Sequence, residues 1–204
     1  MGVCIEVLIA DFAHLRAAPA DRRGELLGVA AFGDPDDPDF DPPEGWSRPE
    51  GATWYERYEF RGTLTSYKPH FWAGERWDRM RHAVAPGLRL AFDEFSAHLF
   101  WGEHNWDGEG ADPPFTPSVP PRAERWGTDT LLSCPPGDVA VFRRHWTRVE
   151  PELPSLRPAF DTYADADPAG WIPDFAAFEA LVAAWGDVVT RAAGRGWGII
   201  GLRC

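Results

Sequence analysis

Apolar positions follow two patterns along this chain. Short runs that predict strands lie near residues 3–9, 128–134 and 197–202, and the first is apolar on both faces apart from Glu6, as in a largely buried strand. Between these runs, apolar residues recur at spacings of three and four, as in helices with one buried face. We therefore expect an α/β or α+β fold in which a small mixed sheet is covered by amphipathic helices.

Two helices are predicted most clearly. One begins at Pro86, and its expected buried line is Leu88, Phe92, Phe95 and Leu99. The other begins after Asp174, with the expected buried line Phe175, Phe178, Val182, Trp185 and Val189. We also expect a strand at 53–60, with a turn rich in aromatic rings following at 67–72.

Two segments interrupt these patterns. Residues 33–50 are rich in Pro and Asp, and residues 109–125 are rich in Pro. Proline removes backbone donors and acidic residues resist burial, so we expect a mobile loop at 33–50 and a second loop at 109–125. With 204 residues, the chain is expected to form one domain, residues 1–204.

Composition narrows the function classes. The net charge of −12 disfavours binding to nucleic acid and to anionic membranes. No apolar run is long enough to span a membrane, and the first residues do not form a signal peptide. The odd count of three cysteines argues against a disulfide framework. These features together predict a cytoplasmic protein.

The main candidate site lies in HLFWGEHNWDGEG, residues 98–110. Glu94 and His98 are four residues apart on the predicted helix and share a face, so a carboxylate can orient an imidazole there as a general base. The other candidates come from the loop that follows: Glu103, His104 and Asp107 as catalytic groups, with Trp101 and Trp106 as pocket walls. A divalent metal held by the same groups stays an alternative, as does a polar surface pair without function.

Three weaker candidates lie elsewhere. His70 is flanked by Tyr67 and Trp72, which suggests either a ligand site walled by rings or a structural aromatic turn. Cys134 is expected at a strand end before a helix, where a thiol is either reactive or buried and inert. A third group, Arg143, Arg144 and Arg148 on one predicted helix, offers either a solvated face or an anion site.

The segments MGVCIEVLIADFAHLRA, LLSCPPGDV and RGWGIIGL together resemble a set of actinobacterial proteins of unknown function. The resemblance covers the two ends of the chain and one turn. It implies no activity, cofactor or site residue.

The sequence thus leads to two functional hypotheses. The first is a protein that binds a small organic molecule in a pocket lined by aromatic rings. If it is an enzyme, it carries out acid–base chemistry without a cofactor, since neither a phosphate-binding loop nor a dinucleotide-binding motif is present. The alternative is a non-enzymatic interaction, immunity or regulatory protein whose acidic loop binds a basic protein partner. The oligomeric state is left open.

Overall fold

A computed structural model describes residues 4–33, 44–100, 126, 129–164 and 170–203. Its strands are β1 (Glu6–Ala10), β2 (Gly45–Ser47), β3 (Tyr55–Glu59), β4 (Thr130–Cys134) and β5 (Gly198–Leu202). Its α-helices are α1 (Phe12–Ala17), α2 (Arg23–Phe32), α3 (Lys68–Met80), α4 (Pro86–Phe100), α5 (Pro136–Val149), α6 (Arg157–Tyr163) and α7 (Phe175–Arg195). Three 3₁₀ turns complete the described elements: η1 (Ala20–Arg22), η2 (Arg81–Ala83) and η3 (Glu150–Leu156).

The five strands form one sheet in the order β2-β3-β1-β5-β4. This arrangement confirms the expected α/β class, but all four strand pairs are antiparallel and the sheet is not mixed. β1 lies at the centre of the sheet with β5 beside it, and both strands are buried along their whole lengths. The edge strand β2 lies inside the segment 33–50 that was expected to be only a loop.

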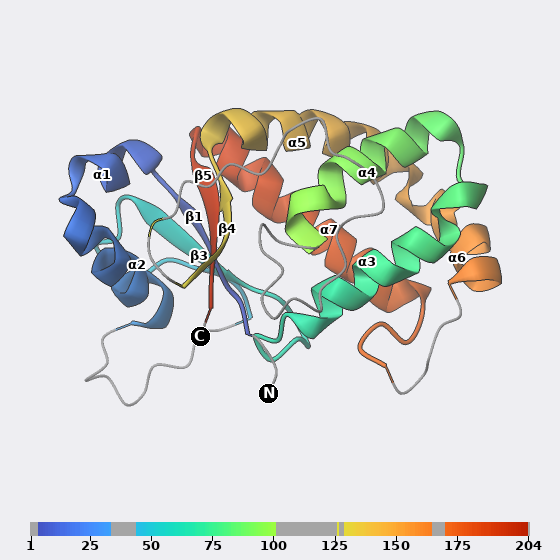
Figure 1. The fold of residues 1–204 in the computed structure, drawn as a ribbon, viewed down its shortest axis with the longest axis horizontal. Coiled ribbons are helices and arrows are strands. Elements are labelled where there is room, and N and C mark those ends of the chain that lie inside the picture. Colours follow the sequence, from blue (N-terminus) through green and yellow to red (C-terminus); the bar gives the residue numbers. More distant parts are fainter. Residues whose placement is uncertain (1–3, 34–43, 101–125, 127–128, 165–169, 204) are drawn as a thin grey trace.

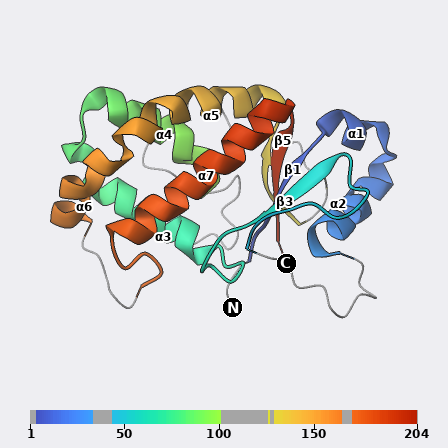
Figure 2. The ribbon, with the colours of Figure 1, turned by 180° about the vertical axis from the view of Figure 1, so that it is seen from behind.

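Helices cover both faces of the sheet. α1 and α2 pack on one face, while α3 to α7 form a larger layer on the other (Figure 1). In the reverse view, α7 runs diagonally across that second layer and leads directly into β5 (Figure 2). The edge formed by β2 and β3 lies next to α7, since Trp46 on β2 and Glu56 on β3 both form hydrogen bonds with side chains of α7.

The predicted buried line of α4 is confirmed for its last three members. Phe92, Phe95 and Leu99 are fully buried, and Leu88 is partly buried against the same core. Phe92 stacks on Trp77 with ring centroids 4.0 Å apart, and Phe95 stacks on Trp146 at 5.0 Å. Trp77 and Trp146 are thus part of the hydrophobic core.

One of the two described cysteines differs from the sequence-based expectation. Cys4 is disulfide-bonded, whereas Cys134 at the end of β4 is buried and not part of a disulfide. The odd cysteine count was therefore misleading for Cys4. Disulfides are typical of oxidising compartments and rare in the cytoplasm. The disulfide of Cys4 therefore gives no support to the cytoplasmic localisation, which stays a prediction. No described helix is both long and apolar enough to cross a membrane.

Candidate functional site

Glu94 and His98 share a face of α4 as predicted, but that face packs into the protein. Their exposed fractions are 8% and 4%, and the His98 ring lies 5.5 Å from the ring of Phe142 on α5. His145, also on α5, has its pKa lowered by burial, while the Glu94 carboxylate opposes this shift. The remaining candidates in this stretch, Trp101, Glu103, His104, Trp106 and Asp107, lie outside the described residues, so their roles stay predictions.

His70 and Tyr67 belong to the aromatic core. The indole Nε1 of Trp185 donates a hydrogen bond to His70 Nδ1 at 3.0 Å, and the Tyr67 ring stacks on the imidazole. Burial lowers the pKa of His70 to about 3, so the imidazole is neutral at physiological pH. The Tyr67 hydroxyl donates to the Phe100 carbonyl oxygen at 3.0 Å. These contacts support the structural interpretation of the ring-rich segment.

Trp72 does not join this pair. Its ring packs against Gly170 and lies under the Arg76 guanidinium, whose central carbon is 5.3 Å from the ring. The segment 67–72 is also not a turn, because helix α3 begins at Lys68, where Pro69 occupies the first turn and loses no hydrogen bond. The three ligand-binding candidates of this segment, Tyr67, His70 and Trp72, therefore do not line one pocket.

For the α5 arginines, the structure favours the solvated face over an anion site. Arg143 Nη1 donates to Thr147 Oγ1 at 2.7 Å on the same helix, and Arg144 and Arg148 are exposed. Among the residues with described positions, no group of three or more His, Cys, Asp or Glu side chains could hold a metal ion.

The most distinctive hollow is an aromatic groove between the β2–β3 edge and α7. It encloses about 750 Å³. Its aromatic walls are Trp46, Tyr58, Phe60 and Trp171, and its apolar lining includes Ile172 and Leu181. A hollow of similar volume near the start of α4, about 720 Å³, has no aromatic residue in its lining. The aromatic groove is therefore the better candidate for an organic ligand.

Strands β2 and β3 and helix α7 contribute opposite walls of this groove. Trp46 on β2 pairs with Tyr58 on β3, and their rings meet edge to face at 4.9 Å. Tyr58 in turn meets Phe60, which follows the last residue of β3, with ring centroids 4.9 Å apart. α7 contributes small side chains opposite these rings, including Ala177, Ala180 and Ala184. Large rings on a strand facing alanines on a helix leave the open volume.

The rim of the groove is polar. Trp46 Nε1 donates to Asp187 Oδ2 at 2.6 Å, and Glu44 Oε1 accepts from the Gly62 backbone N–H at 3.0 Å. Burial raises the pKa of Tyr58, the Asp187 carboxylate raises it further, and Arg61 opposes both. The Tyr58 hydroxyl therefore stays protonated and can donate a hydrogen bond to a ligand.

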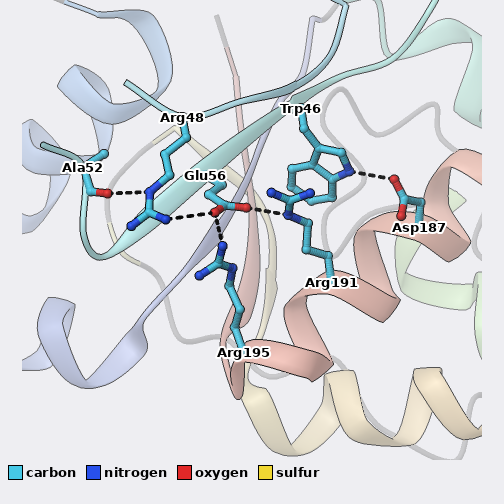
Figure 3. A network of polar contacts seen from close by, with 7 residues as sticks. All are labelled: Trp46, Arg48, Ala52, Glu56, Asp187, Arg191 and Arg195. Atoms are coloured by element: carbon cyan, nitrogen blue, oxygen red, sulfur yellow. Dashed lines mark hydrogen bonds and ion pairs between the residues drawn. The ribbon is translucent and has the colours of Figure 1, made fainter. Parts of the chain in front are cut away.

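An arginine cluster adjoins the groove at Trp46 (Figure 3). The buried carboxylate of Glu56 on β3 accepts from Arg191 Nε at 2.6 Å and from Arg195, and Arg48 Nη1 lies 3.6 Å from it. The Arg191 guanidinium stacks on the Trp46 ring, 4.4 Å from the centroid. Trp46 thus belongs to both features: its ring contacts Arg191, and it also lines the groove.

The sequence-based interpretation missed the groove because Trp46 was assigned to a loop. Two signals were present. WSRPEG followed by TWYERYEF has the form of a hairpin, with a turn at Pro49–Gly51 between two ring-bearing segments. Ala177, Ala180 and Ala184 also recur at helical spacing on one face of the last helix, which indicates a face with room for a partner.

Comparison of the chain with protein-family models, curated proteins and solved structures found no match.

Proposed function

We propose that this protein binds a small organic molecule in the aromatic groove. The observation that carries the proposal is a hollow of about 750 Å³ whose four aromatic walls end in a polar rim. Ligand pockets in proteins commonly have this size and combine apolar walls with a few polar groups that orient the ligand. Here the rings offer apolar area, while Asp187, Arg61 and the Tyr58 hydroxyl offer hydrogen bonds.

The proposal concerns binding and does not include catalysis. Glu94 and His98 line neither this groove nor the hollow near the start of α4. The alternative of a basic protein partner depends on the acidic segment 34–44, of which only Glu44 is described. Glu44 contacts Gly62 at the groove rim, so no separate observation favours that alternative.

Filling the groove tests the proposal. Ala184 is half-buried in the groove, and Ala184→Trp should occupy the space of a ligand. Ala176→Trp provides the matched control, because Ala176 is exposed on the same helix and does not line the groove. A thermal-shift screen of small aromatic compounds should find ligands that raise the Tm of the wild type and of Ala176→Trp by about 5–10 °C at saturating concentration.

The same ligands should not stabilise Ala184→Trp, and Trp171→Ala should weaken their binding by removing one exposed wall. Equal stabilisation of Ala184→Trp and the wild type would exclude the groove as the binding site. A screen in which no compound stabilises the wild type would also count against the proposal.

A further inference from the structure

The arginine cluster carries more positive charge than is needed to neutralise the Glu56 carboxylate. Glu56 is 1% exposed, and the side chains of Arg48, Arg191 and Arg195 all face it. A single arginine would neutralise this carboxylate, so the cluster retains an excess of two positive charges. Like charges held this close repel one another. An anion placed among the guanidinium groups would relieve that repulsion.

The three guanidinium groups are also held in fixed positions. The Arg191 guanidinium is bound through Nε to Glu56 and lies against Trp46. The Arg195 guanidinium binds Glu56 and lies over the Trp197 ring, 4.8 Å from its centroid. Arg48 Nε donates to the Ala52 carbonyl oxygen at 2.7 Å. Each arginine is therefore oriented before any ligand arrives, which reduces the entropy lost on binding.

Donors remain for such a ligand. Neither terminal nitrogen of Arg191 has a partner among the described residues, and the side chain is 41% exposed. The side chains of Arg48 and Arg195 are 45% and 33% exposed. Guanidinium groups bind carboxylate and phosphate oxygens through paired N–H donors, which matches the groups left free here.

We propose that Arg48, Arg191 and Arg195 bind the anionic group, a carboxylate or phosphate, of the ligand whose apolar body lies in the aromatic groove. This inference rests on the proposed function. Trp46 makes the two features continuous, because its ring contacts Arg191 and lines the groove. The net charge of −12 does not prevent local anion binding, since charges beyond about 8–10 Å are largely screened at physiological salt.

The test uses probes that share one body and differ in charge. These are 3-phenylpropionate, 3-phenylpropanamide and 3-phenylpropylamine. Inorganic phosphate is added as an anion that lacks the apolar phenyl group. Binding is followed by NMR through the indole N–H signal of Trp46, which is identified by its loss in Trp46→Phe. We expect the carboxylate to bind about tenfold more tightly than the amide, as one charged hydrogen-bonded contact predicts, and the amine to bind most weakly.

Arg48→Met should abolish most of this preference. It removes the longest of the three contacts, while Glu56 keeps Arg191 and Arg195, so folding is retained. Arg144→Met, at an exposed position on α5, is the matched control and should bind like the wild type.

The outcomes separate the two proposals. Equal binding of the three phenyl probes, or tightest binding of the amine, would overturn the anion site and leave the groove function standing. Phosphate binding that depends on Arg48, without binding of any phenyl probe, would support the anion site and overturn the groove function. No response to any probe at millimolar concentration would overturn both.

Discussion

Two glycines on α7 illustrate how differently single residues contribute to this fold. A Cβ at Gly186 would overlap the indole ring of Trp146, whereas a Cβ at Gly194 would meet nothing within 4 Å. The Trp146 ring cannot easily retreat, because it is buried and stacked on Phe95. Gly186→Ala should therefore lower the free energy of unfolding by about 2–3 kcal/mol, as measured by urea denaturation.

Gly194→Ala is the control on the same helix. It should raise the free energy of unfolding by about 0.5–1 kcal/mol, because alanine favours helix more than glycine does. If Gly186→Ala also stabilised the protein, close packing would not be the reason for glycine at that position.

Single residues also show which features of the site cannot be predicted from the sequence. The ring density and the Glu94–His98 pair were visible in the sequence, but their surroundings were not. The contacts that define the candidate site join residues far apart in the chain: Trp46 and Asp187 are 141 positions apart, and Glu56 and Arg195 are 139 apart. Helical and strand periodicity operate within one element and carry no information about such pairs.

At the scale of elements, the N-terminus of α7 offers a direct test. Asp174 caps this helix by accepting from the Ala177 backbone N–H at 2.9 Å, and Ala177 lines the groove. Asp174→Ala should lower the free energy of unfolding by about 1 kcal/mol, while Asp174→Asn should stay close to the wild type because its amide oxygen also caps. Chemical denaturation measures both, and equal losses in the two variants would argue against a role for the cap.

The spacing of apolar residues predicted most elements, but it misplaced the start of α3 and missed β2. The buried lines of α4 and α7 and the strands β1, β3, β4 and β5 lie where the apolar patterns indicate. α3 begins at Lys68, inside the segment 67–72 that is expected to be a turn, and Pro69 is well tolerated because it lies in the first helical turn. β2 was missed because three residues between prolines are too short to show a period.

At the scale of the whole molecule, two buried groups give stability opposite dependences on pH. Burial raises the pKa of Glu6 from 4.5 to about 7, the Glu59 carboxylate contributes, and Arg57 opposes the shift. One Glu6 oxygen is buried and has no hydrogen-bond partner among the described residues. Folded Glu6 thus keeps a proton that the unfolded chain releases, so this group makes stability fall as the pH rises from about 4.5 to about 7.

His70 acts in the other direction. Burial lowers its pKa from 6.5 to about 3, so the unfolded chain binds a proton that the folded protein excludes. This group therefore makes stability rise as the pH increases from about 3 to about 6.5. Between about pH 4.5 and 6.5 the two contributions oppose each other, each at up to about 1.4 kcal/mol per pH unit.

Replacing either Glu6 or His70 should leave the pH dependence of stability that the other group causes. Relative to the wild type, Glu6→Gln should gain stability as the pH rises through 4.5–7, by up to about 3 kcal/mol in total. His70→Asn retains an acceptor for the Trp185 N–H, and its stability relative to the wild type should decline as the pH rises through 3–6.5. Urea denaturation across this pH range measures both differences. A difference between Glu6→Gln and the wild type that does not vary with pH would mean that Glu6 ionises near its ordinary pKa of 4.5 in the folded protein, because its neighbours offset the effect of burial.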